Sequence, residues 1–198
     1  MTSPSPQKVL LIVGHPDPSA ERFCRALALA YEEGARQNGH AVRVIDVARL
    51  NIPFLRTQQE FESGVVPEQL RPAAADIAWA DHMVLVFPLW LGTMPAMLKA
   101  FMEQLFRPGV AFRYRDKGLP EKLLHGKSAR LVVTMGMPAF VYSLWYRARG
   151  VRGLEHNILR FTGVAPVRTT LIGLAGGAEA GSRVRWLTTL HRMGCEAE

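Results

Sequence analysis

Three segments of the chain combine glycine, proline and aromatic residues in place of the paired charges that acid–base catalysis uses. They span residues 14–23, 88–95 and 134–142, and each follows an apolar run that predicts a strand. In an open parallel sheet, ligands bind at the carboxyl ends of the strands. The composition of these segments favours a flat apolar ligand held between loops, with a phosphate group at the N-terminus of the first helix.

The motifs of several other catalytic classes are missing. Residues 14–19 read GHPDPS, which is not the GxGxxG of a nicotinamide-binding Rossmann fold. Pro88 ends the third apolar run, where a phosphoryl-accepting receiver domain needs an aspartate. Residues 126–128 read GKS, but they precede a strand and lack the leading glycine of a phosphate-binding loop. No GxSxG elbow occurs, and Cys24 and Cys195 form neither a CxxC pair nor a metal-ligand cluster, so no metal site is expected.

Five predicted strands alternate with helical segments, as in a doubly wound α/β protein. The strands are predicted over 8–14, 41–47, 83–87, 129–134 and 167–172, and the continuous apolar runs at 8–14 and 83–87 are typical of buried parallel strands. Helices are predicted over 19–38, 67–80, 96–106, a broken stretch 143–163, and about 179–193. The basic segment 107–128 is expected to be a loop. The alternation predicts one three-layer α/β/α domain over 8–198, with a five-stranded parallel sheet and a disordered tail over 1–7.

The charge and composition point to a globular protein with a cationic surface. The 198 residues carry a formal net charge of +7, and 48% of them are hydrophobic. The basic residues are scattered and match no zinc-finger or helix-turn-helix pattern, so anionic small ligands are expected in place of nucleic acid. Residues 83–98 are uncharged, but they are short and broken by prolines, so no membrane insertion is expected. The absence of a signal peptide and of a disulfide framework favours a cytoplasmic protein.

Three motifs, one in each candidate segment, resemble those of a known family. Residues 87–101 read FPLWLGTMPAMLKAF, which is similar to the family pattern FPLxxxxxPAxLKxW/F. His15-Pro16 follows the first strand, and residues 134–138 read TMGMP, with Tyr142 beyond them. In this order the motifs resemble the flavodoxin-fold NAD(P)H:quinone oxidoreductases of the DT-diaphorase superfamily, in its short bacterial branch. The resemblance covers nearly all of the chain after the tail and implies a flavodoxin-like fold.

The resemblance implies a flavoenzyme. Such a protein takes a hydride from NADH or NADPH onto a bound flavin, FMN or FAD, and passes it to a quinone-like acceptor in a ping-pong scheme. Relatives are homodimers, and helix 96–106 and the Trp145-Tyr146 region are candidate contacts. The alternative is a flavodoxin-fold subunit that senses a nucleotide and regulates a transport system. An electron-carrying flavodoxin is disfavoured because such carriers are usually acidic.

The resemblance also implies roles for individual residues around the flavin. The backbone of Pro88, Leu89 and Trp90 would lie along the edge of the ring, and Leu91 follows them in the binding segment. Trp90 and the loop of Thr134, Met135, Gly136 and Met137 would contact the pyrimidine and dimethylbenzene sides of the ring. Tyr142 is the implied catalytic residue, because its hydroxyl would steady negative charge on the reduced ring. Trp90 and Tyr142 could instead be core aromatic residues.

The phosphate side of the implied site departs from the family. Residues expected there are His15, Arg22, Phe23 and Cys24. Arg22 and Cys24 stand where the family has serine and asparagine, so phosphate binding would depend on Arg22 and on helix amides. His15 could equally be a turn histidine, and Phe23 a core residue. Ala148 replaces a histidine that many relatives have, so a Tyr/His proton relay is not expected.

Overall fold

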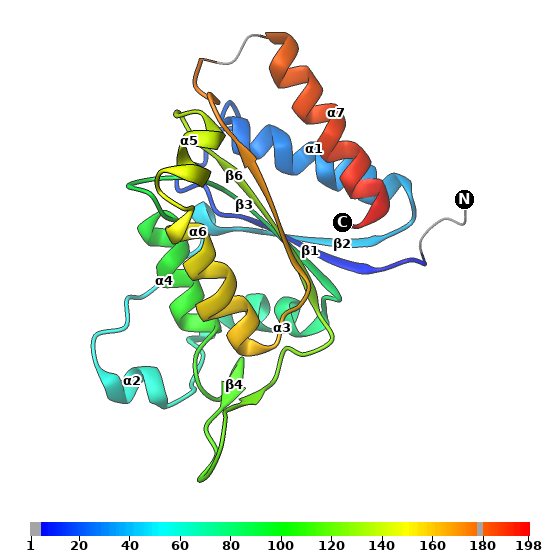
Figure 1. Ribbon diagram of the computed structural model, residues 1–198. Helices are drawn as coiled ribbons and strands as arrows, with labels where there is room; N and C mark the ends of the chain where they lie inside the picture. Colours follow the sequence, from blue (N-terminus) through cyan, green and yellow to red (C-terminus); the bar gives the residue numbers. More distant parts are fainter. Residues whose placement is uncertain (1–4, 178–179) are drawn as a thin grey trace.

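A computed structural model describes residues 5–177 and 180–198, which form a parallel sheet between two layers of helices (Figure 1). The five strands lie in the order β2-β1-β3-β6-β7, and every neighbouring pair is parallel. Their bounds are Lys8–Val13 (β1), Ala41–Asp46 (β2), His82–Pro88 (β3), Ser128–Thr134 (β6) and Val167–Ile172 (β7). The predicted flavodoxin-like fold is confirmed, and the predicted strand bounds hold to within one residue.

The central strands β1, β3 and β6 are buried on both faces, whereas the edge strands β2 and β7 have exposed polar residues. Along β1, Leu10 and Ile12 point into one hydrophobic cluster, and Leu11 and Val13 point into the other. Every residue of β3 is buried. This double burial explains why β1 and β3 read as continuous apolar runs without the alternation of a half-exposed strand.

Two helices cover one face of the sheet, and several shorter ones cover the other (Figure 1). The first pair is α1 (Phe23–Gln37) and α7 (Ala180–Glu196), which pack along each other. The opposite layer contains α3 (Arg71–Trp79), α4 (Ala96–Leu105), α5 (Ala139–Leu144), α6 (Arg149–Gly153) and a π-helical segment, Leu154–Arg160. The short helix α2 (Gln58–Glu62) and two 3-10 turns, Val47–Arg49 and Glu68–Leu70, lie between β2 and α3.

The structure differs from the sequence prediction in several places. The helix predicted over 67–80 is a 3-10 turn followed by α3 from residue 71, and the last helix ends at residue 196 and not at 193. Helix α1 begins at Phe23, not at residue 19, because residues 14–22 form a hydrogen-bonded loop that contains Pro16 and Pro18. The basic segment 107–128 is not all loop, since Phe112–Arg113 (β4) and Glu121–Lys122 (β5) form an antiparallel hairpin. Residues 135–142 are not all loop either, because α5 places Tyr142 on a helix.

Two of the predicted segments, the tail and the last helix, include residues that the structure does not describe. The expected start of the last helix, Glu179, lies outside the described part, and the helix is described from Ala180 to Glu196. Residues 1–4 of the expected tail also lie outside it, so the disordered tail stays a prediction. Among the described residues, none of the helices combines the length and the apolar character that a membrane crossing requires.

Candidate functional site

The three motif segments meet at the carboxyl edge of the sheet because β1, β3 and β6 are neighbours. The backbone N–H of Gly14 donates to the Val86 carbonyl at 2.8 Å, and that of Leu89 donates to the Thr134 carbonyl at 2.7 Å. At Gly14 a Cβ atom would lie 2.6 Å from Leu98 Cδ2, so α4 packs directly on this glycine. The fold therefore joins segments that are more than a hundred residues apart in the sequence.

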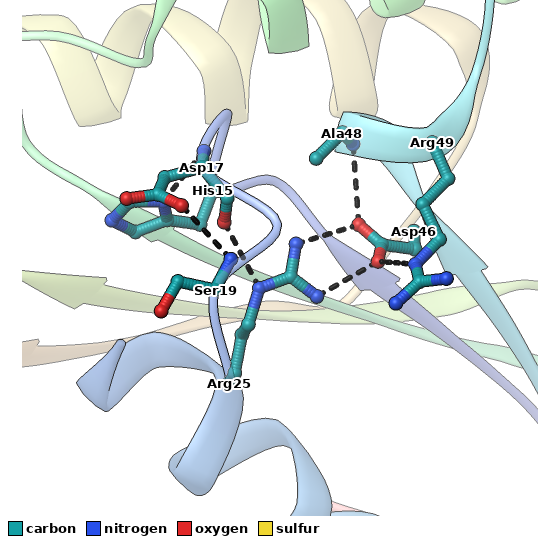
Figure 2. Close-up of polar contacts among 7 residues, drawn as sticks. All are labelled: His15, Asp17, Ser19, Arg25, Asp46, Ala48 and Arg49. Atoms are coloured by element: carbon teal, nitrogen blue, oxygen red, sulfur yellow. Dashed lines mark hydrogen bonds and ion pairs between the residues drawn. The ribbon is translucent and has the colours of Figure 1, made fainter. Parts of the chain in front are cut away.

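The loop between β1 and α1 is organised around Asp17 (Figure 2). The Asp17 amide donates to His15 Nδ1 at 3.0 Å, and the Ser19 amide donates to Asp17 Oδ1 at 2.8 Å. Arg22 Nε donates to Asp17 Oδ2 at 2.6 Å. The Ser19 amide and the Arg22 guanidinium lower the pKa of Asp17, and burial lowers the pKa of His15. The loop therefore holds an ionised carboxylate and a neutral imidazole at neutral pH.

A second set of ionic contacts ties this loop to the end of β2 (Figure 2). Arg25 donates to both carboxylate oxygens of Asp46, at 2.8 and 2.9 Å, and its Nε donates to the Asp17 carbonyl at 3.0 Å. Arg49 reaches the same carboxylate at 3.0 Å. Burial raises the pKa of Asp46, but the contacts from Arg25 and Arg49 outweigh it and leave that pKa below its usual value.

The sequence analysis missed Arg25 and Asp46. The signal was available, because in a β-α-β unit the first turn of the helix lies next to the end of the second strand. An arginine in the first turn of the helix and an aspartate at the end of the second strand can therefore pair.

We expect the Arg25–Asp46 pair to hold this loop in place. Arg25→Gln and Asp46→Asn should each lower the free energy of unfolding by about 2 kcal/mol, because each leaves a half-buried charge without its bidentate partner. The double variant should lose much less than the sum of the two changes. Urea denaturation of the four proteins measures this coupling. The exposed pair Arg36–Glu32 is the matched control and should show a coupling of about 0.5 kcal/mol. Additive losses at Arg25 and Asp46 would contradict the prediction.

The N-terminus of α1 is open to an anion. Its N-cap residue, Arg22, has an extended backbone and makes no side-chain cap, and the first turn contains no acidic residue. Helix N-terminal amides with a positive side chain beside them bind phosphate groups. The next two side chains already have partners within the protein. The guanidinium of Arg183 lies over the Phe23 ring at 4.9 Å, and Cys24 Sγ is 3.1 Å from Thr134 Oγ1.

Cys24 is a packing residue in this arrangement. It is buried, and burial raises the pKa of its thiol to about 11. A thiol with this pKa is almost wholly protonated at neutral pH and is a poor nucleophile. Its contact with Thr134 joins the start of α1 to the end of β6, so the two expected site residues are brought together.

The segment after β3 ends in a tight, strained turn. The amide and carbonyl of Trp90 exchange hydrogen bonds with those of Thr93, at 2.9 and 3.0 Å. The two residues between them have positive φ angles, 48° at Leu91 and 79° at Gly92, which is the backbone of a type I′ turn. Leu91 has no glycine-like freedom, so its conformation stores strain of the kind found at functional sites. Trp90 is half exposed, and its ring lies nearly perpendicular to that of His15, with the centroids 6.0 Å apart.

Tyr142 braces this turn. Its side chain is buried, and its hydroxyl donates to the Gly92 carbonyl at 2.9 Å while it accepts from the Val151 amide at 3.3 Å. Burial raises the pKa of the phenol. The only proton of the hydroxyl is therefore already donated to the backbone of the 90–93 turn.

The remaining expected residues split between surface and core. Gly136 is exposed and Met137 is partly buried at the edge of the site, whereas Met135 and Pro88 are buried. The amides of Leu89 and Trp90 are used within the protein, so they are not free for a ligand. Within the described residues, no group of three or more His, Cys, Asp or Glu side chains lies close enough to hold a metal ion.

Comparison with known proteins shows which family has this fold. The sequence profile of the flavodoxin-like fold family matches residues 7–187. FMN-dependent NADH:quinone oxidoreductase 1 of Bacillus subtilis is 31% identical over 183 residues, which cover 82% of this chain and 85% of that protein. Human ribosyldihydronicotinamide dehydrogenase (quinone) is 31% identical over 79% of this chain and 77% of its own length. The structure of NAD(P)H:quinone oxidoreductase from Methanothermobacter marburgensis superposes with a TM-score of 0.81 at 22% identity, covering 98% of this chain and 100% of that one.

The strand order and the three loops define a flavodoxin-like α/β protein. The chain belongs to the flavodoxin-like fold family, and it is similar to the NAD(P)H:quinone oxidoreductases in that family.

Proposed function

We propose that the protein binds a flavin at the carboxyl edge of its sheet and uses it to reduce quinone-type compounds with NADH or NADPH. The observation that carries this proposal is the meeting of the three motif loops beside the uncapped N-terminus of α1. That arrangement offers an anion site next to a half-exposed tryptophan, which fits a phosphorylated flat ring. The names of the curated relatives, which include an FMN-dependent NADH:quinone oxidoreductase, support it.

On this proposal the phosphate side consists of His15, Arg22, Phe23 and Cys24. Arg22 supplies the positive charge, and the first-turn amides of α1 donate to the phosphate oxygens. His15 and Cys24 are neutral at pH 7 and therefore position the loop without adding charge. Asp17 neutralises part of the charge of Arg22, so the site suits a monoester phosphate that can compete for this guanidinium.

The ring side consists of Pro88, Leu89, Trp90, Leu91 and the loop from Thr134 to Met137. Within the described residues, the amides of Leu91, Gly92, Gly136 and Met137 make no hydrogen bond. These four amides can donate to the polar edge of a flavin and stabilise the negative charge of its reduced state. Tyr142 acts as a positioning residue, because its hydroxyl holds the turn that carries two of these amides.

A flavin bound there would accept a hydride from NADH or NADPH and then pass two electrons to the acceptor in a separate half-reaction. The chain's own contribution is to bind the phosphate, orient the ring and stabilise its charge. We further propose a homodimer. The apolar residues of α4 are buried in the chain's own core, so this helix offers little apolar surface for such a contact.

The proposal is tested by reconstituting the purified protein with FMN and with FAD. We expect one flavin per chain by calorimetry, a visible absorption spectrum, and oxidation of NADH or NADPH that depends on an added naphthoquinone. Parallel lines in double-reciprocal plots would support the two-step scheme. No heat and no spectral change with either flavin would overturn the proposal. Flavin binding without any quinone reduction would favour the alternative, a regulatory module.

A further inference from the structure

A pocket of about 280 Å³ lies between the 90–93 turn and the segment that joins α5 to α6. It is lined by Gly92, Tyr142, Trp145, Tyr146, Arg149 and Gly150. The rings of Tyr142 and Tyr146 stack at 6.4 Å with an angle of 27° between their planes. Ligand pockets usually measure about 300–1,000 Å³, so this one suits a compound of one or two rings and not a whole dinucleotide.

Arg149 gives the lining of this pocket a positive charge that is not paired with a carboxylate of the described residues. Arg149 is the charged member of its lining, and no acidic residue occurs between Glu121 and Glu155. Within the described part of the chain, no carboxylate lies within 4.0 Å of Arg149. Nine other arginines of the protein, including Arg25 and Arg160, have such a partner. The guanidinium of Arg149 is thus available to an anion from outside the chain.

The aromatic wall of the pocket is unusually exposed. Trp145 is 84% exposed and Tyr146 is 51% exposed. Exposed apolar side chains that gather in one place mark binding surfaces. Tryptophan and tyrosine offer flat faces against which another ring can stack at a gain of about 1 kcal/mol beyond simple burial.

The backbone that carries these residues is strained. Arg147 and Ala148 have positive φ angles of 53° and 48°, and neither is glycine. The Ala148 amide donates to the Tyr142 carbonyl at 3.0 Å, which fixes the strained segment to the buried part of α5. Such strain costs about 1–3 kcal/mol per residue and is typical of segments that are shaped for binding.

We propose that this pocket binds the electron acceptor as a small aromatic compound that carries an anionic group. Its ring lies against Trp145 and Tyr146, and its anion meets the guanidinium of Arg149, whose planar geometry matches a carboxylate or a sulfonate. That the ligand is the electron acceptor rests on the proposed function, whereas the preference for an aromatic anion rests on the residues of the pocket alone. A nicotinamide nucleotide also combines rings with anions, but the small volume favours the acceptor.

A redox-inert probe tests the charge preference directly. Calorimetry on the reconstituted protein compares naphthalene-2-sulfonate with the neutral naphthalene-2-sulfonamide, which has the same rings. We expect the sulfonate to bind about tenfold more tightly, since one charge-assisted contact at an exposed site contributes about that much. Equal affinities of the two compounds would overturn the proposal.

Substitutions of Arg149 test whether this residue causes the preference for the sulfonate. Arg149→Gln should remove most of the tenfold preference, and Arg149→Lys should keep part of it because the charge remains. Arg152→Gln is the matched control, since Arg152 is exposed, lies in the same helix and does not line the pocket. It should leave both affinities unchanged. An equal loss in Arg149→Gln and Arg152→Gln would show a general effect of net charge and overturn the proposal.

Steady-state kinetics test whether the pocket binds the electron acceptor or the nicotinamide nucleotide. In Arg149→Gln, kcat/KM for 1,4-naphthoquinone-2-sulfonate should fall about tenfold, while the values for 2-methyl-1,4-naphthoquinone and for NADPH stay unchanged. A fall for NADPH without one for the sulfonate would assign the site to the nucleotide and contradict the proposal. The sulfonate probe needs no electron transfer, so intact selectivity without any quinone reduction would refute the proposed function and leave the pocket's ligand class standing.

Discussion

Replacing Gly194 with alanine is expected to lower the free energy of unfolding by about 3 kcal/mol, because α1 and α7 touch there through their backbones. A Cβ atom at Gly194 would lie 2.1 Å from the Tyr31 carbonyl oxygen. On the facing helix, a Cβ atom at Gly34 would lie 1.9 Å from the His191 carbonyl oxygen. Backbone atoms cannot rotate away as the end of a side chain can. Helix α7 would have to move off α1, exposing Leu190, which is now fully buried.

Urea denaturation of Gly194→Ala and Gly34→Ala measures this effect. Gly181→Ala is the matched control, because Gly181 lies in the same helix and, among the described residues, its Cβ would meet only the end of Arg185, at 4.0 Å. That variant should be neutral or more stable, since alanine favours a helix over glycine by about 1 kcal/mol. Similar losses in all three variants would mean that the helix, and not the crossing, is sensitive to the change.

The sheet could be predicted from the sequence because burial on both faces leaves a strong local signal. The run VLLIV of β1 and the run MVLVF of β3 are apolar throughout, and each is followed by a turn residue. The β4–β5 hairpin could not be predicted in this way. Its strands have two residues each, and its packing depends on a ring contact between Phe112 and Phe161 at 4.9 Å, from distant parts of the chain.

The candidate site could be located from the sequence but not described in detail. The three motif segments meet in the structure, because the order of the parallel strands brings their carboxyl ends together. What each side chain contacts depended on tertiary structure. The hydroxyl of Tyr142 meets the Gly92 carbonyl, 50 residues earlier in the chain, and Cys24 meets Thr134, 110 residues later. No local pattern of residue types encodes these contacts.

The structure also links the strained 90–93 turn to the pocket proposed for the acceptor. A Cβ atom at Gly150 would lie 2.1 Å from the Gly92 carbonyl oxygen and 2.9 Å from Thr93 Cα. The same carbonyl accepts the hydrogen bond of Tyr142. At Gly150, α6 therefore approaches the turn too closely to leave room for a side chain.

Gly150→Ala is expected to separate α6 from the turn and to lower the free energy of unfolding by about 3 kcal/mol, since the clash is with backbone atoms. Gly153→Ala is the control in the same helix: beyond its own helical turn, no atom of the described residues lies within 4 Å of its Cβ position, and the change should stabilise the protein by up to about 1 kcal/mol. Urea denaturation gives both values, and calorimetry with naphthalene-2-sulfonate shows whether the pocket survives. Because Gly150→Ala must displace Gly92, we expect it to lose sulfonate binding even at temperatures where the fold is intact, while Gly153→Ala keeps it. Retention of normal stability and binding in Gly150→Ala would mean that the turn moves freely and that neither Tyr142 nor the 90–93 strain shapes the pocket.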